Sequence, residues 1–128
     1  MLTVQSAFSG FSVDDIDTAE RFYRETLGLK VTRDDMGSLQ LDVTGGTPVF
    51  VYPKGDGHQP ASYTVLNLVV PDVAAAADQL AQSGVQLERY EGFDQDERGI
   101  VHSTDPDQGP TIAWFTDPAG NVLSIMAG

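Results

Sequence analysis

The chain has 128 residues, the length of one domain, and 41% of them are hydrophobic, enough to bury a core. It contains no cysteine, which excludes disulfides, thiolate metal sites and cysteine nucleophiles. Nineteen acidic residues oppose seven Lys and Arg, and the resulting net charge of −12 predicts no nucleic-acid partner and no attraction to anionic membranes. No apolar run reaches the roughly 20 residues of a membrane span and no signal-peptide pattern opens the sequence, so we expect a cytoplasmic protein.

The first half of the sequence predicts a strand, a helix and three further strands. β-branched and aromatic residues over 3–13 favour the first strand. Asp14-Asp15 then offers a helix N-cap, and apolar residues at helical spacing follow until Gly28, which stands where a C-capping glycine belongs. Turns rich in Asp, Gly and Thr separate three short strands, expected at 29–34, 38–43 and 47–53.

The second half predicts the same order after a Gly- and Pro-rich loop at 53–60. A strongly apolar strand is expected at 63–70. The next helix should start at Pro71-Asp72 and end at Ser83-Gly84. The remaining strands are expected at 85–90, 111–116 and 121–126.

Equivalent positions of the two halves keep a nearly constant separation. The helix-starting Asp15 and Asp72 are 57 residues apart, and the helix-ending Gly28 and Gly84 are 56 apart. Neither half could bury its sheet alone, so the halves should pack together. The repeat therefore predicts a single domain, residues 1–128, made of the modules 1–56 and 61–128.

Two motifs at opposite ends of the chain resemble a known family. The helix that opens with Asp15-Ile16 and ends in Phe22-Tyr23-Arg24-Glu25-Thr26-Leu27-Gly28-Leu29 is similar to the opening of vicinal oxygen chelate proteins. The segment Trp114-Phe115-Thr116-Asp117-Pro118-Ala119-Gly120-Asn121 is similar to their closing motif. This superfamily includes glyoxalase I, the bleomycin-resistance proteins and the extradiol dioxygenases, so the resemblance leaves the activity open.

The resemblance implies an α+β fold. Its two βαβββ modules would form a U-shaped, partly open eight-stranded barrel around a cavity. It also implies a homodimer.

Members of this superfamily that use a metal carry one ligand on the first and last strand of each module. The first is usually a His seven residues before the helix-starting Asp, and the last a Glu four residues after the glycine of the final turn. The corresponding positions here are Phe8, Val65, Phe50 and Ser124. Phenyl and alkyl groups have no lone pair, and a neutral hydroxyl is a poor ligand for a divalent ion. We therefore expect no metal and no other cofactor.

Other chemical sites find little support in the sequence. His58 and His102 lie in separate loops, where histidines are more often solvated than ligating. There is no G-x-S-x-G elbow for a serine nucleophile and no glycine-rich loop followed by Lys-Ser/Thr for phosphates.

The acidic segment after residue 90 partly matches a calcium loop. Asp94, Asp96, Gly99 and Asp105 take template positions 1, 3, 6 and 12, but Arg98 occupies position 5, where an oxygen ligand is needed. We interpret the segment as a solvated acidic loop. Alternatively, residues 91–109 form a lid over the barrel mouth, since insertions of this length are often functional.

Alternation along the expected strands predicts which side chains face the barrel interior. On the first strand Phe8, Gly10 and Ser12 should share that face, while Phe11 and Val13 pack on the helices. The cavity residues predicted in this way are Phe8, Gly10, Phe50, Tyr52, Val65, Asn67, Ser124 and Met126. Trp114 is added to them as a stacking surface, with packing in the core as its alternative. Aromatic walls with a few polar groups are typical of a small-molecule pocket. The alternative is that these side chains fill the barrel and leave no cavity.

The sequence therefore favours a metal-free small-molecule-binding protein. It could resemble bleomycin-resistance proteins, which bind and sequester a drug without altering it. Residues 65–128 hold ten acids and two bases, so an aromatic or cationic compound is the expected ligand. The first alternative is a glyoxalase- or dioxygenase-type enzyme with a relocated metal site, and the second is a structural dimer with a filled barrel.

Overall fold

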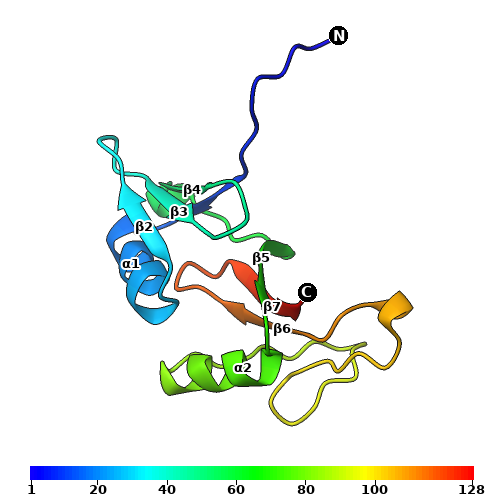
Figure 1. Cartoon of the computed structure of the whole chain (residues 1–128). Coiled ribbons are helices and arrows are strands. Elements are labelled where there is room, and N and C mark those ends of the chain that lie inside the picture. The colour runs from blue at the N-terminus through cyan, green and yellow to red at the C-terminus, as the bar shows by residue number, and fades with distance from the viewer. The chain divides into compact units, whose positions relative to one another are not determined.

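The computed structural model describes residues 1–128, whose contacts divide into two compact units, Met1–Pro60 and Ala61–Gly128 (Figure 1). Each unit has its own helix and its own open sheet, seven strands in all. The fold is thus of the α+β class, as predicted. None of the helices has both the length and the apolarity that crossing a bilayer requires.

The first unit contains one helix and a four-stranded sheet. Its strands are β1 (Gly10–Val13), β2 (Lys30–Arg33), β3 (Leu39–Asp42) and β4 (Val49–Pro53), and its helix α1 (Ile16–Arg21) continues as a π-helical turn, Phe22–Thr26. The strand order is β1-β4-β3-β2. β1 pairs with β4 in parallel, whereas the other two pairs are antiparallel.

Local signals begin and end α1 as the sequence predicts. The Asp15 side chain accepts hydrogen bonds from the amides of Asp17 and Thr18, and the Thr18 amide lowers the pKa of this carboxyl. Gly28 has a φ of 70° just after the helical segment, a conformation that side chains rarely adopt. Phe11 is buried and its ring lies 6.0 Å from that of Tyr23, so β1 packs on the helix through this side.

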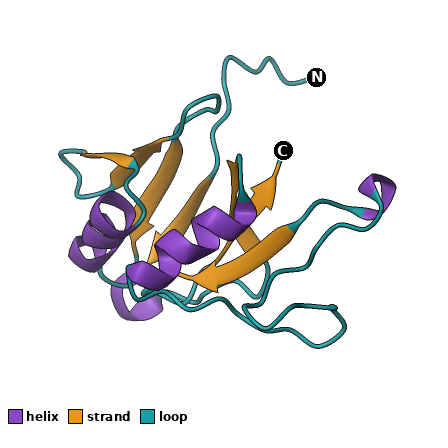
Figure 2. Cartoon of the chain, turned by 60° about the horizontal axis from the view of Figure 1, so that its bottom comes forward, coloured by secondary structure: helices purple, strands orange, loops and turns teal.

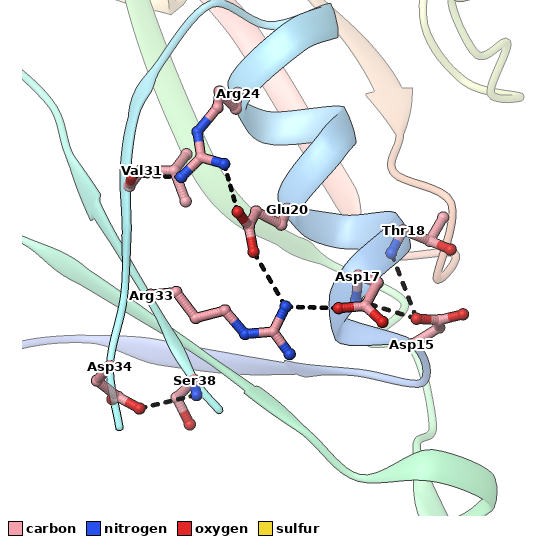
Figure 3. A network of polar contacts seen from close by, with 9 residues as sticks. All are labelled: Asp15, Asp17, Thr18, Glu20, Arg24, Val31, Arg33, Asp34 and Ser38. Atoms are coloured by element: carbon pink, nitrogen blue, oxygen red, sulfur yellow. Dashed lines mark hydrogen bonds and ion pairs between the residues drawn. The ribbon is translucent and has the colours of Figure 1, made fainter. Parts of the chain in front are cut away.

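A polar network joins α1 to the neighbouring strand (Figure 3). Arg33 Nη1 contacts Asp17 at 2.5 Å and Glu20 at 3.1 Å. Arg24 pairs with Glu20 and donates to the Val31 carbonyl at 2.8 Å. These contacts lie on the outside of the unit, where each ion pair stabilises only modestly.

The second unit repeats the strand topology of the first with one strand fewer. Its elements are β5 (Thr64–Val70), α2 (Val73–Gln82), β6 (Ile112–Thr116) and β7 (Val122–Ala127), with strand order β5-β7-β6. The first strand again pairs in parallel with the last, and the last pairs antiparallel with the strand before it. α2 lies against β6 and β7 (Figure 2).

The closing motif of the chain is a hairpin turn between β6 and β7. The buried Asp117 accepts hydrogen bonds from the amides of Ala119 and Asn121 and from the Asn121 side chain, at 3.0, 2.8 and 3.1 Å. Gly120 has a φ of 84°. The residues that carry the family resemblance here thus stabilise a turn.

Two expected strands are wrong in part or in whole. The first, expected over 3–13, is formed only from Gly10, and residues 1–9 are exposed. Pairing with β4 ends where Phe50 N donates to Ser9 O, because Pro48 precedes β4 and has no N–H to continue the ladder.

The strand expected at 85–90 does not form, so the sheets contain seven strands and not eight. Only one backbone hydrogen bond, Glu88 N to Trp114 O at 2.7 Å, links this segment to β6. On the segment itself, the Gln95 side chain accepts from Tyr90 N and donates to Glu88 O. Local side-chain hydrogen bonds therefore take up backbone groups that a regular strand would leave for a neighbour.

Candidate functional site

The face of the first sheet opposite α1 carries an aromatic cluster. Gly10 lies beside Phe50 in the β1–β4 register, and Ser12 lies beside Tyr52. The Phe50 and Tyr52 rings are stacked at 5.7 Å with an interplanar angle of 21°. Phe8, which is 70% exposed and precedes β1, meets Phe50 edge-on at 6.1 Å. Three of the predicted cavity residues therefore form one aromatic surface.

Gly10 leaves the space that this cluster occupies. A Cβ at this position would come within 3.0 Å of the Phe50 carbonyl oxygen and 3.4 Å of its Cβ. Any side chain here would have to displace β4 or the Phe50 ring. A glycine at position 10 thus allows β4 and the Phe50 side chain to lie close to the backbone of β1.

A hollow of about 450 Å³ adjoins this cluster within the first unit. Its walls combine apolar groups with one carboxylate, and it is lined by Ser6, Ala7, Phe8, Asp34, Gln40, Thr47, Pro48, Val49 and Phe50. Both hydrogen bonds to the Asp34 side chain, from the amides of Met36 and Ser38, use Oδ1 (Figure 3 shows the second). The arrangement suits a ligand with an apolar body and a positive group.

Sequence reasoning found Phe8 and Phe50 but missed Asp34 and Gln40. Gln40 could have been found, because it alternates with the buried Leu39 and Leu41 and must therefore face away from the helix. Asp34 lies in a turn, where no periodicity marks its direction.

The corresponding face of the second sheet combines polar and apolar side chains. Asn67, Ser124 and Trp114 lie in register across β5, β7 and β6. Ser124 is fully buried, and its hydroxyl donates to Asn67 Oδ1 at 2.6 Å. Met126 lies beside Val69 in the same ladder, while Val65 sits at a register irregularity of β5. The predicted cavity residues thus form two groups, one in each unit.

The four positions that hold metal ligands in some relatives do not fit a divalent ion here. Phe8, Phe50 and Val65 offer no donor atom, and the Ser124 hydroxyl proton is committed to Asn67. No group of three or more His, Asp or Glu side chains in the chain could hold a metal ion. Of the histidines, His58 Nδ1 lies 2.7 Å from Ser12 Oγ and His102 Nε2 lies 2.7 Å from Asp96 Oδ2.

Asp96 organises the turn that resembled a calcium loop. Its side chain accepts from the amides of Arg98, Gly99 and Ile100 and pairs with His102. Burial raises the pKa of Asp96, but the hydrogen bonds from Ile100, His102, Arg98 and Gly99 outweigh it and lower the pKa to about 2. This carboxylate therefore holds the local backbone.

The Trp114 ring contacts two further rings, which come from the irregular chain between α2 and β6. Tyr90 meets it edge-on at 5.5 Å and 74°, and Phe93 lies 4.9 Å away at 51°. Thr116 Oγ1 donates to Glu88 Oε1 at 3.4 Å. Sequence reasoning named Trp114 but missed Tyr90 and Phe93, because it placed them in a strand and an acidic loop with no reason to meet.

Comparisons with known proteins agree with this architecture. The family model of the Glyoxalase/Bleomycin resistance protein/Dioxygenase superfamily matches residues 7–125. No curated protein sequence matches the chain.

Three solved structures illustrate the likeness. A superfamily member from Sphaerobacter thermophilus DSM 20745 is 23% identical, with 100% of both chains covered and a TM-score of 0.71. TnmS3, an antibiotic binding protein from Streptomyces sp. CB03234, is 23% identical over 99% of this chain and 98% of its own, with a TM-score of 0.68. A glyoxalase/bleomycin resistance protein from the same strain is 24% identical over 95% and 99%, with a TM-score of 0.64. With the family model covering nearly the whole sequence, the chain belongs to the Glyoxalase/Bleomycin resistance protein/Dioxygenase superfamily.

Proposed function

We propose that this protein binds an aromatic, cationic small molecule and holds it unchanged, with no metal ion in the site. The observation that carries the proposal is the donor-poor set Phe8, Phe50, Val65 and Ser124. A divalent ion needs several lone pairs in its first shell, and these four side chains together offer one hydroxyl that is already hydrogen-bonded. Phe8 and Phe50, which line the hollow of the first unit, are suited to packing against a ligand.

Charge and aromatic content both favour a cationic, aromatic ligand. The net charge of −12 raises the local concentration of cations around the protein. The rings of Phe8, Phe50 and Tyr52 offer faces for stacking, and a cation over such a face gains about 0.5–2 kcal/mol, depending on how far it is desolvated. Asp34 is the one carboxylate among the residues that line the adjoining hollow.

A structural neighbour supports the binding of a small molecule. TnmS3 is described as an antibiotic binding protein. Because this chain shares only its fold at 23% identity, the ligand of TnmS3 is not carried over to this protein.

We further propose that the two units act as one domain, residues 1–128, in a cytoplasmic homodimer. The family model runs through both units, which supports a single domain. Sedimentation velocity at several protein concentrations would test the dimer. A single species at monomer mass throughout would contradict it.

The proposed function is tested by metal analysis followed by a thermal-shift screen. Purified protein should contain no stoichiometric divalent metal, and cationic aromatic compounds should raise its Tm, because a ligand of the folded state stabilises it. The shift should shrink for Phe50→Ala and persist for Tyr63→Ala, which removes an exposed ring outside the cluster. Stoichiometric zinc, nickel, iron or manganese would favour the enzyme instead, and a screen without any hit would favour a filled barrel.

A further inference from the structure

We propose that Glu88, Tyr90, Phe93 and Trp114 form a binding site for a substituted ammonium group. The proposal rests on the proposed function, since it concerns the same class of ligand, and it narrows the cation to a substituted ammonium. All four residues belong to the second unit. Three come from the segment that leads into the long loop, and Trp114 comes from β6.

The three rings meet at an angle and are not stacked. Tyr90 and Phe93 are inclined to Trp114 by 74° and 51°, and they remain 36% and 52% exposed. The exposed part of each of these two rings is open to a ligand, so a cation can contact them there. Aromatic walls set at steep angles are the usual way in which proteins surround a methylated ammonium.

A carboxylate lies beside these rings. Glu88 reaches Thr116 on the same strand as Trp114. Burial and, after it, the negative charge of Glu88 raise the pKa of Tyr90, so the phenol stays neutral and the charge of Glu88 acts on the ring cluster. A cation in contact with the rings would therefore also be attracted by a nearby full negative charge.

The two arginines of this unit are engaged elsewhere. Arg89 lines a hollow of about 710 Å³ beside α2, whereas the Glu88 side chain reaches Thr116 on β6. Arg89 donates to Asp96 O at 2.6 Å, and Arg98 donates to Ala74 O and pairs with Asp78. Residues 61–128 contain no other Lys or Arg, so no basic side chain of this unit is held against Glu88.

These features select among ligand classes. An anion would be repelled, and a neutral aromatic molecule would gain nothing from Glu88. A calcium or magnesium ion requires several oxygen ligands, where this site offers one carboxylate and a hydroxyl. An ammonium that carries alkyl groups can use the ring faces and the carboxylate together.

The single tryptophan of the chain makes the site directly observable, because all tryptophan emission comes from Trp114. Choline is titrated against its uncharged isostere 3,3-dimethyl-1-butanol. Choline should change the emission in a saturable way and bind about tenfold more tightly than the alcohol. Equal affinities would overturn the proposal.

Two acid-to-amide variants separate the site from the general field of the protein. Glu88→Gln should weaken choline binding about fivefold to tenfold and leave the weaker alcohol unaffected. Glu91→Gln removes the same charge from an exposed residue three positions further on and should change little. Phe93→Ala should weaken both ligands. Equal effects of Glu88→Gln and Glu91→Gln would contradict the assignment.

The failure of this inference can be told apart from failure of the proposed function. Suppose that a screening hit raises the Tm by the same amount in the wild type and in Glu88→Gln and leaves Trp114 emission unchanged. That result would overturn the ammonium site alone. Choline binding at Trp114 in a protein that holds a stoichiometric metal would support the ammonium site and overturn the metal-free function.

Discussion

The two units share one strand topology but differ in whether a fourth strand is present. Both place the first strand parallel to the last, and both begin their helix with an Asp cap at the same point of the repeat. The first unit adds a fourth strand, whereas the second replaces it with a segment held by Gln95 and a long loop. Helix caps and turn glycines mark the shared topology in both units. In the second unit, the irregular segment that stands in place of the fourth strand brings Tyr90 and Phe93 to Trp114.

The units also differ in charge. The first holds five basic residues, of which Arg24 and Arg33 pair with acids of α1, and the second holds only two for ten acids. The second unit therefore has the stronger uncompensated negative charge. This difference supports the assignment of the ammonium site to the second unit.

The largest expected difference between the units lies in their final turns. Asp117→Ala removes the acceptor of three hydrogen bonds in a buried turn and should cost about 2–4 kcal/mol of unfolding free energy. The comparison change Asp42→Ala, at the last residue of β3 before the corresponding turn, removes only an acceptor for Gln40 and should cost less than about 1 kcal/mol. Urea denaturation measures both, and equal costs would break the comparison.

Gln95→Ala tests what replaces the missing strand. The Gln95 side chain bonds Tyr90 N, Glu88 O and Gly99 O at 2.8, 2.9 and 2.7 Å. Its loss should cost about 1–2 kcal/mol and speed amide exchange from Glu88 to Gly99. Gln79→Ala, on the exposed side of α2, should leave the exchange rates of this segment unchanged. Unchanged exchange in Gln95→Ala would mean that other contacts hold the segment.

Gly10→Ala tests the aromatic cluster of the first unit. The new Cβ would lie 3.0 Å from Phe50 O, so we expect a loss of about 1 kcal/mol and a displaced Phe50 ring. Binding of a cationic aromatic ligand should weaken with it. Gly57→Ala, where a Cβ would meet nothing within 4 Å, is the control. Wild-type affinity in Gly10→Ala would remove this cluster from the site.

The smallest expected effect is a pH dependence at Asp96. Its folded-state pKa of about 2 lies below the ordinary value of 3.8, so its contribution to stability is full above about pH 4 and is lost as the pH falls towards 2. Asp96→Asn keeps an acceptor for the turn amides but cannot titrate, so its Tm should fall less steeply across this range. Asp94→Asn should follow the wild type, and a wild-type profile in Asp96→Asn would assign the acid sensitivity elsewhere.

Local signals predicted the elements that depend on neighbouring residues. The Asp15 and Asp72 caps, and the burial of Phe11 and Val13 on one side of β1, follow from chemistry and alternation within a few residues. The prediction of a strand at 85–90 was wrong because the Gln95 side chain binds backbone groups of Glu88 and Tyr90. The strand propensities of residues 85–90 contain no information about this contact.

The strand residues of the candidate site could be predicted from the sequence, but the turn and loop residues that contact them could not. Alternation along single strands predicted Phe50 and Tyr52, since side chains alternate regularly there. Asp34, Tyr90 and Phe93 come from turns and loops, whose directions depend on the folded chain.

The most direct test of a metal-free binding site is one titration carried out before and after chelation. A cationic aromatic ligand from the thermal-shift screen is titrated into protein dialysed against EDTA and into untreated protein, at the same ionic strength. We predict the same Kd in both. Loss of binding after chelation, with recovery when zinc or another divalent ion is restored, would contradict the account.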